Sequence, residues 1–301
     1  MQSCKRVNMN TDIRTLIIDI KAAARIGHTE SLWVALDGLL DLPQVAGNPT
    51  MDAAFIEKTI LPIGQALSAP RLRMAALQPL LDEPQAALRA CAAAALAFRL
   101  LRQEKFSSKQ LAKPGKDSRQ DVRLALRLAL AEAAEDHPER LVPLVDEWIA
   151  ARSPRQQAIA IGLLTILPEK ALNALAGLEN PSDPEVRAAL VEALTGLAQN
   201  GQAEAVLGLL ADWAANRENN IWVICKTLSG SWAANYPQAA LEILPVLLPK
   251  TDNPKQIINT LQALHRHGAE SDVLAALRGW QNSGNRPLTE LADHVLNKLD
   301  S

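Results

Sequence analysis

The sequence predicts an all-α protein, a right-handed α-solenoid of helical hairpins with an amino-terminal helical cap. Alanine and leucine fill 98 of the 301 positions, whereas Phe, Trp and Tyr together fill ten. Ala and Leu favour helices and sheets favour β-branched and aromatic residues, so this usage argues against a β-sandwich or barrel. A pair of apolar segments separated by helix-breaking residues also recurs at intervals of 30 to 36 residues, which indicates a repeat array.

The region 11–69 is expected to form helices that cover the first end of the array. Residues 1–10 show no hydrophobic periodicity, so we expect a disordered tail there, or a translation start at Met9. The loop between the second and third of these helices is expected at 42–49. The helical pattern covers three stretches, roughly 12–26, 30–40 and 51–69.

Residues 70–301 form the predicted array, which continues from 11–69 as a single solenoid without a separating linker. The second helix of each hairpin opens with an aliphatic residue followed by an anchor position, as in Val122-Arg and Val186-Arg. Apolar residues one before, three after and seven after the anchor fall on one helix face. One hairpin cannot bury its own apolar face, so neighbouring hairpins must stack. The anchors are Arg89, Arg123, Gln157, Arg187, Ile221, Ile257 and Ala292.

The first helix of each hairpin is expected upstream of its anchor, before a turn rich in Asp, Asn, Ser and Pro. Pro suits the first turn of a helix, and the short polar side chains can cap its free N–H groups. One hairpin is shortened, since only 107–112 remain for its first helix before the polar segment Lys113-Pro-Gly-Lys-Asp117, expected as an exposed loop. The other first helices are expected at 72–81, 141–149, 171–178, 203–214, 239–248 and 273–280.

These residues resemble the HEAT repeat, an antiparallel helix pair with Asp and Pro in the turn and Val-Arg or Leu-Arg opening an Ala-rich second helix. The likeness is good at 70–96, 117–130, 137–164 and 168–194, and looser over 202–299, where Ile221 and Ile257 replace the Arg. The resemblance implies an α-solenoid that binds a macromolecular partner on its concave surface.

Several classes of function find no support in the sequence. The longest apolar run, Ala90 to Phe98, has nine residues, and a bilayer span needs about 20, so we expect no membrane partner. The scattered Cys4, Cys91 and Cys225 indicate neither a disulfide framework nor a thiolate metal cage, and they fit a reducing cytoplasm. The five histidines lack metal-ligand spacing. We therefore expect no catalytic residue, metal or small-molecule cofactor.

A basic run around the shortened hairpin is the first candidate binding surface. Residues 1–120 contain 16 Lys or Arg against 11 Asp or Glu, whereas residues 121–301 contain 15 against 22. Such a patch can attract phosphates or an acidic partner. The alternative is a solvated loop with repeat arginines, such as Arg123, bonding inside the hairpin. The candidate side chains are Arg99, Arg102, Lys105, Lys109, Lys113, Lys116, Arg119 and Arg127.

Tryptophan provides the second candidate surface. Trp148, Trp213 and Trp280 recur near the end of first helices, which favours packing between hairpins. Trp222 and Trp232 stand outside this set, and we consider them as an aromatic pair facing the binding groove.

We expect a non-enzymatic scaffold or adaptor whose partner is a protein. The alternative is nucleic-acid binding, because 121–148, from Asp121-Val-Arg through His137-Pro-Glu-Arg-Leu to Trp148, is similar to HEAT-like DNA glycosylases of the alkylation-repair class. That likeness implies a basic concave surface that grips damaged DNA, with the 99–127 run on the phosphates. No catalytic acid can be aligned with a residue of this chain. A third hypothesis is a regulatory or assembly factor for an enzyme.

Overall fold

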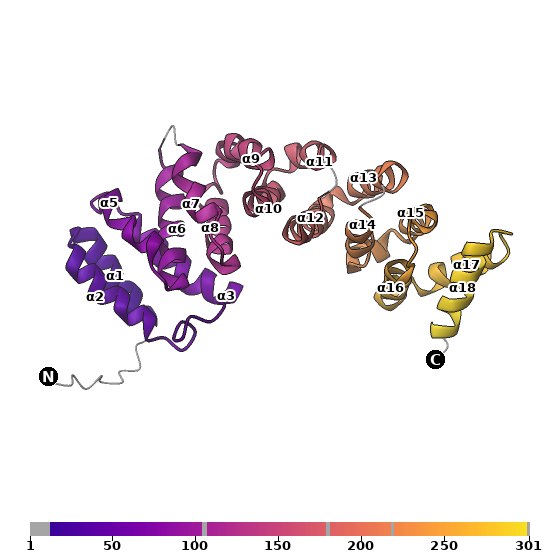
Figure 1. Ribbon diagram of the computed structural model, residues 1–301, viewed down its shortest axis with the longest axis horizontal. Helices are drawn as coiled ribbons and strands as arrows, with labels where there is room; N and C mark the ends of the chain where they lie inside the picture. The colour runs from indigo at the N-terminus through magenta and orange to yellow at the C-terminus, as the bar shows by residue number, and fades with distance from the viewer. Residues whose placement is uncertain (1–12, 104–106, 179–180, 218–219, 300–301) are drawn as a thin grey trace. The chain divides into compact units, whose positions relative to one another are not determined.

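The computed structural model describes residues 13–103, 107–178, 181–217 and 220–299, and within them every regular element is a helix (Figure 1). This confirms the all-α prediction. The expected disordered tail at 1–10 and the candidate Lys105 lie outside the described residues. None of the described helices is long and apolar enough to span a membrane. Contacts group the chain into two compact units, Met1–Ile159 and Ala160–Ser301.

The first unit begins with the predicted amino-terminal helices. Among them, α1 (Ile13–Ile26) packs against both α2 (Thr29–Leu40) and α4 (Leu61–Leu67). The expected loop at 42–49 is a series of tight turns in which Asn48 adopts a positive φ of 59°. The elements are α1 (Ile13–Ile26), α2 (Thr29–Leu40), α3 (Ala53–Phe55), η1 (Ile56–Ile60) and α4 (Leu61–Leu67).

The helices of the first unit that follow α4 lie close to the segments where helix pairs were predicted. The first helices of these pairs are short and partly 3₁₀, whereas the second helices are long. The last of these second helices is α10 (Pro154–Leu163), which begins in the first unit and ends in the second. The elements are α5 (Met74–Leu77), η2 (Pro79–Asp82), α6 (Ala86–Leu101), η3 (Ser108–Leu111), α7 (Ala112–Gly115), α8 (Gln120–Ala133), η4 (Pro138–Leu141), α9 (Val142–Ile149) and α10 (Pro154–Leu163).

The core of the first unit is built around the alanine-rich helix α6, which packs between α4 and α8. Ala90 and every residue from Ala92 to Ala95 are fully buried. The approach to α4 is very close, because a Cβ built on Gly64 would lie 2.5 Å from the Ala94 Cβ. Small side chains on both helices therefore set this spacing.

The shortened hairpin differs from the prediction at Lys113-Pro-Gly-Lys-Asp117. The segment Ala112–Gly115 is a helical turn, and Pro114 and Gly115 are buried. The indole of Trp148 packs against Gly115, since a Cβ on Gly115 would lie 2.9 Å from its Cη2 atom. The sequence suggested an exposed loop because Lys, Pro and Gly are typical of loops, but a tryptophan from the next hairpin packs on the turn. This contact confirms packing between hairpins for Trp148.

The described part of the second unit contains four further helix pairs, from α11 and α12 to α17 and α18. The elements are η5 (Leu164–Ile166), α11 (Pro168–Ala176), α12 (Pro184–Leu197), η6 (Ala198–Gln202), α13 (Ala203–Asn216), α14 (Ile221–Leu228), η8 (Ser231–Asn235), α15 (Pro237–Leu247), η9 (Leu248–Lys250), α16 (Lys255–Leu264), η10 (His265–Ala269), α17 (Glu270–Gln281) and α18 (Arg286–Leu299).

Helices of the second unit form two rows. The first helices α11, α13, α15 and α17 contact one another in succession, and the second helices α12, α14, α16 and α18 do the same (Figure 1). Two connections between the rows are tight turns at Gly201 and Gly268, whose φ values of 91° and 108° favour glycine. Trp213 is fully buried and Trp280 is half-buried.

Candidate partner-binding surfaces

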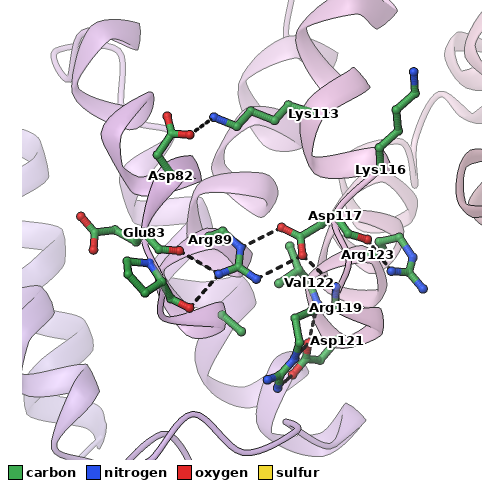
Figure 2. Close-up of polar contacts among 12 residues, drawn as sticks. Asp82, Glu83, Arg89, Lys113, Lys116, Asp117, Arg119, Asp121, Val122 and Arg123 are labelled. Carbon is green, nitrogen blue, oxygen red and sulfur yellow. Dashed lines mark hydrogen bonds and ion pairs between the residues drawn. The ribbon is translucent and has the colours of Figure 1, made fainter.

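The structure divides the basic run between internal contacts and exposed surface. Arg89 on α6 donates from Nε to Asp117 Oδ2 at 2.8 Å and from Nη2 to Asp117 Oδ1 at 3.2 Å (Figure 2). It also donates to the carbonyl of Glu83 at 2.7 Å. The buried Arg123 on α8 donates to the Asp117 carbonyl at 2.5 Å. Each arginine thus bonds the carbonyl six residues earlier, in its own hairpin turn.

Arg119 and Asp121 connect this hairpin to the turns at 42–51. Arg119 donates to the Asp121 carboxylate at 2.7 Å (Figure 2). It also donates to the carbonyl of Pro49 at 2.6 Å. Asp121 is 2% exposed and accepts the backbone N–H of Met51 at 3.0 Å. Burial of the carboxyl acts to raise its pKa, but the hydrogen bonds from Arg119 and the Met51 amide outweigh burial and hold the pKa below its ordinary value.

Asn48 supplies a second connection from the same turns. Its side-chain oxygen accepts the backbone N–H of Ala86, the first residue of α6, at 3.0 Å. Its amide donates to the Pro84 carbonyl at 3.3 Å. An Asn from a distant segment therefore caps α6, in the place of the preceding Gln85, whose side chain makes no capping hydrogen bond.

The remaining members of the basic run are spread over several environments. Arg99 is half-buried and donates to the Leu72 carbonyl at 2.5 Å, and the exposed Lys113 pairs with Asp82. Arg127 is half-buried and has an interaction partner. Exposed side chains that make no ion pair with another described residue are Arg102, Lys109 and Lys116. The described part of the run thus combines internal arginine contacts, one exposed ion pair at Lys113, and three exposed cations that make no ion pair with a described residue.

The two candidate tryptophans lie in different environments. Trp222 on α14 is half-buried, and the guanidinium of Arg187 lies over its ring, 5.6 Å from the centroid. Trp232 is 5% exposed, contacts Gly230 and has an indole N–H without a hydrogen-bond partner in the described part of the chain. Trp222 is therefore partly accessible to solvent, whereas Trp232 belongs to the core.

Trp222 borders a trough of about 610 Å³ on the row of second helices. The sequence prediction did not include its other polar residues. Glu192 and Thr195 lie on the face of α12 opposite the buried Leu190 and Leu194, and Gln199 on η6 continues that face. That helical spacing was the available signal. The trough is lined by Thr165, Ala188, Val191, Glu192, Thr195, Gly196, Gln199, Trp222 and Lys226.

The described residues offer little nucleophilic or metal chemistry. Burial raises the pKa of the Cys91 thiol and raises that of Cys225 to about 12, so both remain protonated near neutral pH. In the described ranges no group of three or more His, Cys, Asp or Glu side chains could hold a metal ion.

Comparison with known proteins adds no assignment. No protein-family model matches the chain, and no curated protein shows significant sequence similarity to it.

Proposed function

We propose that this chain is a right-handed α-solenoid of HEAT-like hairpins that acts as a non-enzymatic scaffold or adaptor for a protein partner. The two rows of helices in the second unit support the repeat architecture, because stacked hairpins place equivalent helices next to one another. The arginines that bond the carbonyl six residues earlier occupy the same position in successive hairpins, at Arg89 and Arg123.

The observation that carries the proposal is the half-buried Trp222 beside the trough between α12 and α14. Tryptophan is enriched among the residues that dominate binding energy in protein interfaces. The guanidinium of Arg187 lies over its ring and favours one orientation of the indole before any partner arrives. Glu192 and Lys226 carry opposite charges at the same trough, which suits the mixed polar surface of a protein better than a phosphate backbone.

The mechanism of such a scaffold is binding itself. A partner side chain or loop enters the trough and covers Trp222, while Glu192, Gln199 and Lys226 contact its polar groups. The helices α12 and α14 pack against each other in one row, so little backbone entropy is lost when the partner binds. The free thiols Cys91 and Cys225 suit a reducing compartment, and we place the protein in the cytoplasm.

The test compares Trp222→Ala with Trp280→Ala, the matched half-buried tryptophan of α17. Each variant and the wild type are used for affinity capture from cell lysate, followed by mass spectrometry and by a titration with the purified captured protein. We expect a partner that loses about tenfold or more in affinity for Trp222→Ala and retains its affinity for Trp280→Ala. Equal capture by both variants would contradict the proposal, provided that circular dichroism shows both to be folded.

Nucleic-acid binding remains the second candidate because Arg102, Lys109 and Lys116 are exposed. Each phosphate contact makes the affinity depend on salt. With three contacts, a plot of the logarithm of the binding constant against the logarithm of the salt concentration would have a slope of about −3. We expect no such binding when duplex DNA is titrated at low salt. Salt-sensitive binding that is abolished by replacing the three cations with Ser would favour this candidate, and release of methylated bases would favour the glycosylase.

A further inference from the structure

A second groove lies on the opposite row of the second unit, between the first helices α13 and α15. Its volume is about 490 Å³, and its lining is mainly apolar. Tyr236 and Val246 line it and are 38% and 41% exposed, which is unusual for large apolar side chains in this protein. The groove shares no residue with the trough at Trp222.

The groove follows the lengths of both helices. On α13 its lining residues lie at helical spacing from Glu204 through Leu207 and Ala211 to Ala215, and on α15 they extend from Ala239 to Val246. Because α13 and α15 are neighbours in one row, these faces enclose a valley about three turns long. A valley of this length and direction fits the ridge of side chains on one further helix.

The lining of the groove is open at the exposed Gly208. A Cβ built on this glycine meets no atom within 4 Å beyond its own helix neighbourhood. No described side chain lies over Gly208, so the backbone of a docked helix can approach it closely.

The charge along the groove has one sign. Glu204 and Glu242 are exposed lining residues, and none of the lining residues is Lys or Arg. The nearby Lys250 is used internally, since its Nζ donates to the carbonyls of Ala214 and Ala215 at 2.7 and 2.6 Å, at the end of α13. The groove therefore presents negative potential beside an apolar floor.

We propose that this groove binds an amphipathic helix of a partner protein whose apolar stripe is flanked by Lys and Arg. The apolar stripe covers Leu207, Gly208 and Ile243, and the flanking cations lie against Glu204 and Glu242. Docking an amphipathic helix into an apolar groove is a common mode of peptide recognition. The chain thereby has two binding surfaces on different rows, as an adaptor requires.

The probe is a fluorescein-labelled peptide of about 18 residues with a leucine stripe flanked by lysines, and its control carries glutamates in place of the lysines. Fluorescence anisotropy with the full chain should show saturable binding of the lysine peptide only. Gly208→Leu fills the groove and raises helix propensity, so it should lower the affinity about tenfold or more without unfolding the protein. Gly279→Leu is the matched control, because Gly279 on α17 is equally open and lies outside the groove, and it should bind as the wild type does.

Charge reversal tests the electrostatic half of the proposal. Glu204→Lys should weaken binding, whereas Glu169→Lys, at the equivalent second position of α11, should not. The proposal is overturned if the lysine peptide fails to bind, if it binds Gly208→Leu as tightly as the wild type, or if both peptides bind equally. Sedimentation that shows a dimer abolished by Gly208→Leu would also overturn it, because a second copy of the chain would then fill the groove. Retained peptide binding in Trp222→Ala would separate this site from the proposed partner surface.

Discussion

Arg89 on α6 and Asp117 in the turn before α8 form a two-point ion pair between successive hairpins, with Nε to Oδ2 at 2.8 Å and Nη2 to Oδ1 at 3.2 Å. The two side chains are 14% and 12% exposed, so the pair is largely shielded from water. Asp117 also accepts the backbone N–H of Arg119 at 2.9 Å. The pair therefore fixes both the spacing of the two hairpins and the start of α8.

Breaking this pair should destabilise the first unit. We expect Arg89→Met to lower the free energy of unfolding by about 2–3 kcal/mol, because it leaves a shielded carboxylate without its partner. Urea unfolding of Arg89→Met, Asp117→Asn and the double variant would measure the coupling between the two side chains. Lys113→Ala is the control, since the pair of Lys113 with Asp82 is exposed and should contribute less than about 1 kcal/mol. Additive losses in the cycle would contradict the interpretation.

Asp121 should make the stability of the first unit sensitive to acid. Its pKa is lower in the folded protein than in the unfolded chain, so the folded state binds fewer protons at this site. The stabilisation is fully present above the unfolded pKa of about 4, and it is lost as the pH falls through the lower folded value. We expect Asp121→Asn to lower the free energy of unfolding near neutral pH. Below a pH of about 4, this free energy should fall less steeply with decreasing pH in the variant than in the wild type. Parallel stability curves for the variant and the wild type would exclude this role.

The close approach of α4 and α6 should reverse the usual effect of replacing a helical glycine. Gly64→Ala would place its Cβ 2.5 Å from that of Ala94, so we expect a loss of about 1–3 kcal/mol from overpacking. Adding Ala94→Gly should recover part of the loss in thermal unfolding. At the open position Gly208, the same exchange to alanine should instead stabilise the protein by about 0.5–1 kcal/mol.

The internal thiols should be unreactive in the folded protein. Cys91 is fully buried and Cys225 is 3% exposed, and burial raises the pKa of both. In a Cys4→Ser variant at pH of about 8, where a free cysteine of ordinary pKa reacts readily, we expect Ellman's reagent to modify neither thiol until denaturant is added. Rapid reaction of either thiol under native conditions would show that the helices around it open.

The hairpins could be predicted because their physical causes are local. Apolar periodicity of 3.6 residues and Pro or Asp in the turns lie within about a dozen residues of the helices that they define. The network around Asp121 could not be predicted, since its partner Met51 is 70 residues away and no pattern in the chain connects them. Trp222 and Trp232 looked alike in sequence, and only the packing of η8 against α15 and α16 distinguishes the buried one. The buried turn at Gly115 was missed for the same reason, because Trp148 packs on it from the next hairpin.

The enclosure of α6 by α4, α8 and η2 has a consequence for the dynamics of the chain. The residues Ala92 to Leu96 are fully buried within this helix, so their amides stay shielded from solvent while the surrounding helices remain packed. In deuterium exchange, the amides of Ala92 to Leu96 should therefore be the last of the first unit to take up label, and they should exchange only when that whole unit unfolds.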